Sequence, residues 1–205
     1  MNQLRDIQDL ILVRAAQRGQ TKAFDSIVAR YQRRIYNLAL RMCPTEADAE
    51  DATQEAFVAV YRGIKGFKGG ASLDTWIHRV AVNACLMRRR KAAGGSDATV
   101  DDTVLDERLP DTAPDPLAEA LQTELSATVA DAVKRLPEAQ QTVVLLHGMQ
   151  GFTYAEIATI LACPIGTVKS RLSAAFTCMR RTLAEYVQPE PSITAAPTPA
   201  TEASR

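Results

Sequence analysis

A helix expected from about Leu73 to the basic run at 88–91 carries residue types that could hold an unpaired nucleic-acid base. Five residues at spacings of three or four share one face of it: Trp76, Arg79, Asn83, Met87 and Arg90. An exposed aromatic ring, a phosphate partner and a base-edge hydrogen bonder are what a platform for an unstacked base requires. The alternative is that the Trp only covers a domain edge. The spacing alone does not distinguish this structural role from a base-binding platform.

A second candidate site lies between residues 136 and 172. Thr153 and Glu156 form a capping box that opens a short helix, 154–161, and Pro164 suits the first turn of the next helix. Two helices joined by a turn of about three residues are what a helix-turn-helix requires. On the second helix, side chains that could meet phosphates or a guanine edge are Thr167, Lys169, Ser170 and Arg171. An amphipathic hairpin is the alternative, although the compact turn and polar first half favour DNA binding.

An acidic stripe marks a further helix, expected from the N-cap Thr45 to about Tyr61. Asp48, Asp51 and Glu55 fall together, opposite an apolar stripe. Acids near a helix N-terminus are favoured by the helix dipole, so the stripe alone more often indicates a solvated face. Glycines are then expected to break the helix into a loop, KGFKGGAS, that precedes the Trp-bearing helix: Gly63, Gly66, Gly69 and Gly70.

Little in the sequence supports an enzyme. His78 and His147 stand far apart, and neither has an evident nucleophile or carboxylate partner. Four cysteines are scattered singly, without a C-x-x-C pair or a nearby His at ligand spacing. We therefore expect no catalytic residue, no metal site, no cofactor and no small-molecule substrate.

Apolar runs stay well short of the roughly 20 residues that span a bilayer. The first residues are too polar for the core of a signal peptide. The sequence therefore predicts a cytoplasmic protein with no direct membrane insertion.

Charge is distributed unevenly along the 205 residues, although the formal net charge is zero. Residues 1–93 carry 16 Lys and Arg against 9 Asp and Glu, whereas residues 94–116 carry 1 against 7. This asymmetry is typical of a basic module that meets a polyanion, followed by an acidic connector. Residues 94–116 lack apolar periodicity, so they predict a linker between two domains, and the Pro-rich stretch 188–205 predicts a disordered tail.

Over about residues 8–187 the chain resembles the extracytoplasmic-function (group IV) sigma factors of bacterial RNA polymerase. Three stretches carry the resemblance in the family's order: DAEDATQEAFVAVYRGIKGF, FKGGASLDTWIHRVAVNACLMRRRK and LPEAQQTVVLLHGMQGFTYAEIATILACPIGTVKSRL. They resemble the clamp-binding helix, the segment that melts and reads the minus-ten element, and the domain that reads the minus-thirty-five element.

The resemblance implies an all-α protein with two small helical domains, a sigma region 2 bundle over 1–93 and a sigma region 4 helix-turn-helix over 117–187, joined by the flexible acidic linker 94–116. It implies a non-enzymatic function, in which core polymerase is bound and promoters are recognised, melted and transcribed. The implied polymerase-binding residues are Asp48, Asp51, Gln54 and Glu55. The implied minus-ten residues are Lys68, Trp76, Arg79, Asn83, Arg88, Arg89 and Arg90, and those for minus-thirty-five are Thr167, Lys169, Ser170 and Arg171.

The implied partners are core RNA polymerase, through the clamp helices of its largest subunit and the flap of its second-largest subunit, and promoter DNA. An anti-sigma factor is a further candidate. Where the family commonly has basic residues after TVKSRL, this chain has Ser173, Ala174, Ala175 and Phe176, which weakens the expected minus-thirty-five contact. A sigma mimic that titrates an anti-sigma factor is therefore the alternative. A response-regulator effector would need a receiver domain, and residues 1–93 show no alternating strands.

Overall fold

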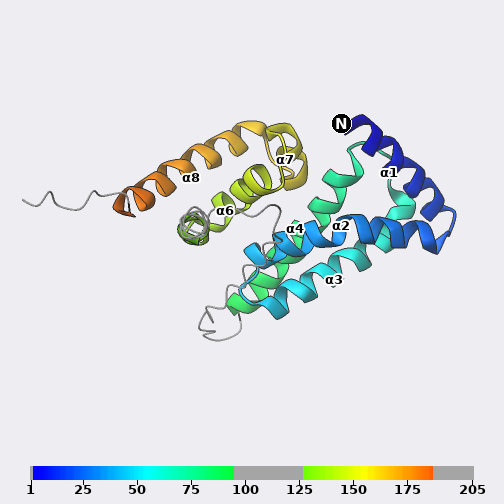
Figure 1. The fold of residues 1–205 in the computed structure, drawn as a ribbon, viewed down its shortest axis with the longest axis horizontal. Helices are drawn as coiled ribbons and strands as arrows, with labels where there is room; N and C mark the ends of the chain where they lie inside the picture. Colours follow the sequence, from blue (N-terminus) through cyan, green and yellow to red (C-terminus); the bar gives the residue numbers. More distant parts are fainter. Residues whose placement is uncertain (1, 95–126, 187–205) are drawn as a thin grey trace, which may run out of the picture.

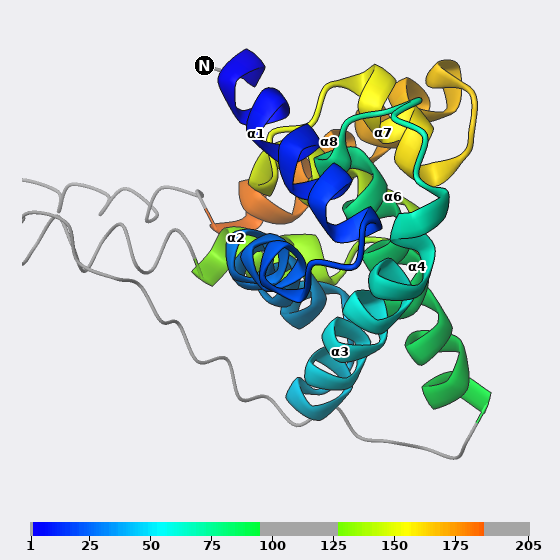
Figure 2. The same cartoon turned by 90° about the vertical axis from the view of Figure 1, so that its right-hand side faces the viewer.

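The computed structural model describes residues 2–94 and 127–186, which are helical wherever they are regular. Residues 2–94 form the N-terminal half, in which three long helices pack side by side and a shorter helix lies across one end (Figures 1 and 2). In chain order its elements are α1 (Asn2–Gln17), α2 (Thr21–Met42), α3 (Glu46–Gly63), the 3-10 turn η1 (Ile64–Gly66) and α4 (Leu73–Gly94). The expected linker, apart from Gly94, and the expected tail lie outside the described residues.

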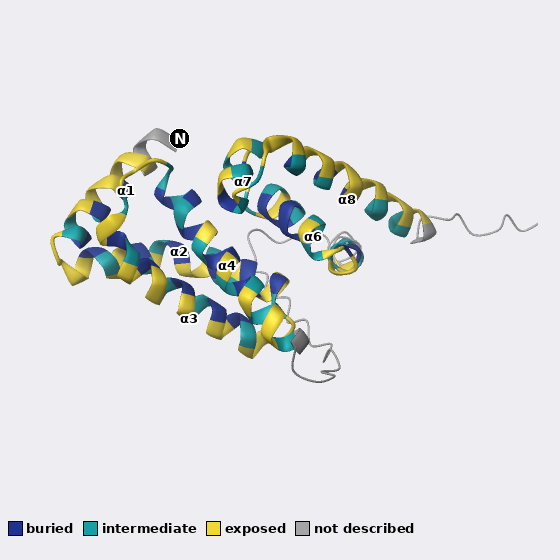
Figure 3. Ribbon diagram, turned by 180° about the vertical axis from the view of Figure 1, so that it is seen from behind, coloured by how far each residue is buried: buried dark blue, intermediate teal, exposed yellow. Residues whose placement is uncertain are grey.

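Residues 127–186 form the C-terminal half. After a helical segment over 127–134 its elements are α6 (Glu138–Val144), the π-helical turn η2 (Leu145–Met149), α7 (Tyr154–Leu161) and α8 (Ile165–Tyr186). α8 runs outward from its start beside α7, with one exposed side along its length and its more buried side toward α6 (Figure 3). The helix-turn-helix expected from the sequence is therefore present as α7 and α8.

The capping residues start their helices as the sequence predicts. The Thr45 side chain accepts a hydrogen bond from the backbone N–H of Asp48 at the start of α3. Thr153 and Glu156 form the complete reciprocal capping box, and α7 spans the expected residues. The α7–α8 turn is made by Ala162 in the left-handed region, with φ of 49°. The local chemistry thus fixed both helix starts.

α3 ends at Gly63, the first of the glycines expected to break it. The loop does not begin there, because α3 passes directly into η1. A Cβ built on Gly63 would lie 3.1 Å from Cζ2 of Trp76. This glycine therefore makes room for an indole ring, and the chain leaves the helical conformation only after Gly66.

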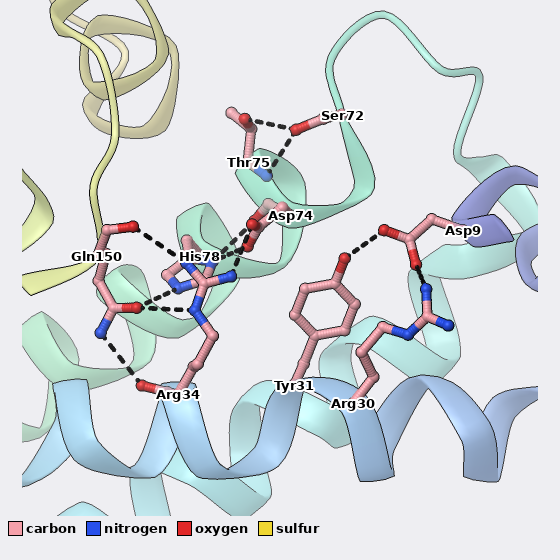
Figure 4. Close-up of polar contacts among 9 residues, drawn as sticks. All are labelled: Asp9, Arg30, Tyr31, Arg34, Ser72, Asp74, Thr75, His78 and Gln150. Carbon is pink, nitrogen blue, oxygen red and sulfur yellow. Dashed lines mark hydrogen bonds and ion pairs between the residues drawn. The ribbon is translucent and has the colours of Figure 1, made fainter. Parts of the chain in front are cut away.

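The N-terminal half has its own apolar core between α1, α2, α3 and α4. Its fully buried side chains include Ile27, Tyr31, Ile35, Val60 and Ile77. The buried Asp9 carboxylate accepts hydrogen bonds of 2.5 Å from both the Tyr31 hydroxyl and Arg30 (Figure 4). This paired carboxylate ties α1 to α2.

A second apolar cluster is shared by the two halves. It contains residues of α2, α3 and α4 together with residues of α6, η2, α7 and α8. The contributors from the N-terminal half are Leu38, Ala39, Met42, Ala49, Ala52, Val82 and Cys85, and those from the C-terminal half are Val143, Leu145, Leu146, Phe152, Ile157, Ile160, Val168 and Leu172. The described parts of the two halves therefore pack against each other.

Candidate functional site

A pocket of about 360 Å³ opens at the glycine loop between α3 and α4. Its lining combines loop backbone, an aromatic ring and two cations from the expected minus-ten set: Gly66, Phe67, Lys68, Gly70, Ala71, Thr75, Trp76, Arg79 and Thr159. The structure thus brings Lys68, Trp76 and Arg79 to one concave site. A hollow with an aromatic wall and nearby cations has the chemistry to take an unstacked base and its phosphates.

Trp76 is half-buried, so the expectation of an exposed indole needs correction. Its ring lies against Phe67, with centroids 5.0 Å apart and planes at 40°. It also packs against the core of the N-terminal half and against Gly63. The ring is therefore fixed in position, and only part of its surface faces the pocket.

Side chains that the sequence did not single out hold the loop in place. The Gln17 amide donates 2.9 Å hydrogen bonds to the carbonyl oxygens of Ile64 and Phe67. The Ser72 hydroxyl accepts a bond from the Thr75 backbone N–H, which caps the start of α4. Gly69 has a φ of 76°, a conformation that L side chains rarely adopt. No local sequence pattern links Gln17 to a loop about fifty residues away.

The remaining expected minus-ten residues separate into two groups. Asn83 and Arg90 are exposed on α4, beyond the pocket. Arg88 instead bonds Asp51 at 2.7 Å and Glu55 at 2.5 Å, with Asp48 at 3.9 Å. Arg89 bonds Gln141 at 2.7 Å and lies 3.4 Å from Glu138. In this conformation Arg88 and Arg89 are thus engaged by the protein itself.

The acidic stripe lies on the flank of α3 that faces Arg88 of α4. This guanidinium has its pKa raised, chiefly by the hydrogen bond to Glu55. Asp51 and Glu55 keep about half of their side-chain surface exposed. A groove of about 670 Å³ continues along the same helix, lined by Gln54, Glu55, Val58, Ala59, Arg62 and Gly63. The expected polymerase-binding residues therefore form one accessible surface that is part acidic and part apolar.

The start of α8 presents the residues expected to read DNA. Lys169 and Ser170 are exposed, whereas Thr167 and Arg171 are partly buried. Val168, Leu172 and Ala175 are buried on the other side of the helix. The start of α8 therefore has a polar surface on one side and is packed against the protein on the other, an arrangement suited to binding in a DNA groove.

A polar cluster that the sequence did not reveal joins α2, α4 and the turn before α7 (Figure 4). The expectation that His78 has no carboxylate partner is wrong. Its Nδ1 lies 2.8 Å from both the carbonyl oxygen and Oδ1 of Asp74, one helical turn away. Arg34 donates to Asp74 Oδ2 at 2.7 Å, and His78 Nε2 lies 3.3 Å from Oε1 of Gln150. His78 is fully buried and packs edge-on against Phe152.

This cluster predicts a pH effect on stability. Burial alone would raise the pKa of Asp74, but the bonds and charges of His78 and Arg34 together lower it. A carboxylate with a lowered folded-state pKa stabilises the fold above its unfolded pKa, about 4, and loses that contribution as the pH falls through the folded pKa. We expect the free energy of unfolding to fall more steeply below about pH 5 in wild type than in Asp74→Asn.

Urea titrations at a series of pH values measure this difference. Asp25→Asn is the matched control, because Asp25 is exposed on α2. The free energy of unfolding of Asp25→Asn should depend on pH in the same way as that of wild type. Parallel curves for wild type and Asp74→Asn would show that the Asp74 carboxylate does not contribute as described.

Among the described side chains, no group of three or more His, Cys, Asp or Glu is placed to hold a metal ion. All four cysteines are free thiols. Within the described ranges, no helix is both long and apolar enough to cross a membrane.

Two family models match the chain. Sigma-70 region 2 covers residues 27–94, and Sigma-70, region 4 covers residues 126–179. The RNA polymerase sigma-H factor of Pseudomonas aeruginosa is 37% identical over an alignment of 171 residues, and the match covers 80% of this chain and 88% of that protein. The ECF RNA polymerase sigma-E factor of Escherichia coli (strain K12) is 33% identical over an alignment of 188 residues, and the match covers 89% of this chain and 96% of that protein.

Two solved structures share the fold. CnrH in complex with the cytosolic domain of CnrY has a TM-score of 0.64 at 22% identity, covering 87% of this chain and 98% of that chain. The sigma factor RpoE in complex with the anti-sigma factor NepR from Bartonella quintana has a TM-score of 0.62 at 23% identity, covering 80% and 98%. At these identities the likeness concerns the fold.

Proposed function

The chain belongs to the extracytoplasmic-function family of bacterial RNA polymerase sigma factors, and we propose from this premise which of its surfaces bind polymerase and which bind promoter DNA. It is a sigma factor that binds core RNA polymerase and directs transcription initiation at promoters. The family is not known to be enzymatic, so we assign the function to binding surfaces. We infer a division into region 2 over 1–93, a linker over 94–116, region 4 over 117–187 and a tail over 188–205.

We propose that the pocket at the glycine loop receives an unstacked base of the minus-ten element. The observation that carries this proposal is the convergence of Lys68, Trp76 and Arg79 on one hollow beside the loop. Asn83 and Arg90 extend the surface along α4, toward the next nucleotides. Among the described residues of the expected minus-ten set, Lys68, Arg79 and Arg90 have no ion pair and can meet phosphates, whereas Arg88 and Arg89 would first have to exchange their protein partners.

We propose that the α3 surface of Asp48, Asp51, Gln54 and Glu55 binds the clamp helices of the polymerase largest subunit. Its mixture of exposed carboxylates and a groove containing Val58 and Ala59 suits a basic and apolar helical partner. On region 4, we propose that Thr167, Lys169, Ser170 and Arg171 read the minus-thirty-five element. The flap of the second-largest subunit is the proposed polymerase contact of region 4.

Run-off transcription tests this function. Purified chain, added to core polymerase with a library of promoter fragments, should yield discrete transcripts that core alone does not produce. A sigma mimic would bind an anti-sigma factor and yield no transcript. Absence of transcripts across the library, despite demonstrated core binding, would contradict promoter recognition.

Arg171→Ala tests the minus-thirty-five surface. A good contact between a side chain and a base edge is worth about 1–3 kcal/mol, so we expect about 5- to 150-fold weaker holoenzyme binding to the selected promoter. Arg180→Ala is the matched control, because Arg180 is exposed on α8 but lies nine residues further along, on the other side. Equal losses in both variants would remove Arg171 from the reading surface.

A further inference from the structure

Two cysteines of region 2 meet where the end of α2 packs against α4. Cys43 directly follows α2, and its backbone N–H bonds the carbonyl oxygen of Ala39 at 2.8 Å. Cys85 lies in α4, forty-two residues further along the chain. The two thiols are hydrogen-bonded to each other. The fold therefore assembles a thiol pair from cysteines that stand singly in the sequence.

The two thiols differ in their exposure. Cys85 is buried, at 1% exposed, and belongs to the apolar cluster that both halves of the chain share. Cys43 packs against the same cluster but keeps part of its surface exposed. A small oxidant can therefore reach the Cys43 sulfur from solution, whereas the Cys85 sulfur is covered by neighbouring side chains.

The two thiols also differ in their acidity. The hydrogen bond from the Cys85 thiol lowers the pKa of Cys43, and the charges of Arg89 and Arg88 lower it further. Burial and the Asp48 carboxylate act in the opposite direction, but the pKa of Cys43 stays below its ordinary value. The pKa of Cys85 is raised, first by its hydrogen bond with Cys43 and then by burial. Because the thiolate is the reactive form of cysteine, Cys43 is the nucleophile and Cys85 holds the proton.

We propose that Cys43 and Cys85 form a reversible oxidation site, at which a hydroperoxide converts the two thiols into a disulfide between α2 and α4. The Cys43 thiolate attacks an oxygen of the peroxide, which forms an S–O bond, breaks the O–O bond and, with hydrogen peroxide, releases hydroxide. The Cys85 sulfur then attacks the Cys43 sulfenic acid. An S–S bond forms, the S–O bond breaks, and the oxygen leaves as water with the Cys85 proton. The two sulfurs together lose two electrons, and these reduce the peroxide.

The disulfide would tie the end of α2 to the middle of α4. Because the thiols are already in contact, the bond requires little movement of either helix. Closing a loop of about forty residues lowers the entropy of the unfolded chain and so stabilises the fold. Where cellular thiols are kept reduced, such a disulfide is transient, and thiol exchange restores the pair. This site does not rest on the function proposed for the base pocket.

The test uses the full chain, as wild type and with Cys163→Ala and Cys178→Ala together. Those two cysteines are partly exposed thiols of region 4, so the double variant leaves the pair alone. Reduced protein is treated with hydrogen peroxide, blocked with N-ethylmaleimide and digested for mass spectrometry without reductant. We expect a Cys43–Cys85 cross-linked peptide within one chain in both proteins, and its loss with dithiothreitol. The oxidised form should melt higher by about 5 °C or more.

Substitutions of the pair separate the two steps. Cys85→Ser cannot form the disulfide but keeps a hydroxyl donor for Cys43, so the Cys43 sulfenic acid should accumulate and be captured by dimedone. Cys85→Ala removes the donor as well, and capture should be about three- to tenfold slower, because less of Cys43 is thiolate. Cys43→Ala is the control and should give neither a cross-link nor a dimedone adduct. Circular dichroism establishes that each variant is folded.

The cross-link in the chain with an intact pair decides the site even where a substituted pair fails to fold. If peroxide leaves both thiols free, or produces only disulfides between molecules, the oxidation site is overturned. Capture by dimedone at Cys85 in the Cys43→Ala variant would reverse the assigned roles. Equal capture rates in Cys85→Ser and Cys85→Ala would contradict activation of Cys43 by its partner, and an unchanged or lower melting temperature would contradict a stabilising link.

Discussion

Replacing Asp51 and Glu55 together by Arg is expected to weaken binding to core RNA polymerase by at least about a hundredfold. Like charges brought together at a protein interface cost several kcal/mol, and each 1.4 kcal/mol is about tenfold in affinity. Both carboxylates are about half exposed on the α3 surface, and Glu55 also lines the groove beside it. Titration of labelled protein with core polymerase measures the loss.

Arg88 complicates this experiment, because it bonds both carboxylates in the free protein. Arginines at positions 51 and 55 would repel it and disturb the packing of α3 on α4. A neutral pair, Asp51→Asn with Glu55→Gln, keeps the side-chain sizes and is expected to give a smaller loss, on the order of tenfold. The helical circular dichroism spectrum of both variants should match that of wild type.

Asp25→Arg is the matched charge control. Asp25 is exposed on a different helix, α2, and does not belong to the proposed polymerase surface. This variant should bind core polymerase with wild-type affinity. Equal weakening by Asp25→Arg would point to overall charge and not to the acidic stripe, whereas wild-type binding by the reversed pair would remove the stripe from the polymerase interface.

Helix starts and the helix-turn-helix were predictable because their causes are local in sequence. Thr45 and Thr153 need only the residues three positions later to cap α3 and α7. The pocket was partly predictable for the same reason, since the glycine loop directly precedes the helix that carries Trp76 and Arg79. Spacing shows which residues share a helix face, and it can therefore place neighbours on one surface.

The burial of α4 on a second side was not predictable in this way. Ile77 and Ala81 face the core of region 2, but His78, Val82 and Cys85 are also buried. Part of what covers them comes from region 4, beyond the acidic segment, and helical periodicity carries no information about so distant a partner. The ion pairing of Arg88 with α3 was not predictable either, because a run of basic residues does not show which of them pairs with a carboxylate of the same protein.

The partial burial of Trp76 changes how its expected role in promoter opening should be tested. Two features set the indole in place, the contact with Phe67 and the absence of a side chain at Gly63. A ring held in this way can receive an unstacked base without first losing side-chain entropy. Asn83 lies seven residues further along, about 10 Å at 1.5 Å per residue, and is exposed. This separation suits two or three nucleotides of an unpaired strand.

Trp76→Ala and Asn83→Ala are therefore each expected to impair initiation on duplex promoters much more than on templates with a pre-melted bubble. A base–aromatic contact is worth about 1–3 kcal/mol, which offsets part of the cost of unstacking. We expect about a 5- to 150-fold loss of run-off transcript on duplex DNA for Trp76→Ala, and a smaller loss for Asn83→Ala. Permanganate footprinting should show reduced opening, and core binding should be preserved.

Stability must be separated from recognition, because Trp76 also packs against the region 2 core. Phe24→Ala is the matched control: Phe24 is a half-buried aromatic residue packed against the same core, in edge contact with Tyr61, and it does not line the pocket. It should lower the melting temperature but keep the same ratio of duplex to bubble activity as wild type. Asn83→Ala removes an exposed side chain and should leave the melting temperature unchanged. If Trp76→Ala and Phe24→Ala lose duplex and bubble activity alike, the indole serves the fold alone, because a residue that helps to open DNA must become less important once the DNA is already open.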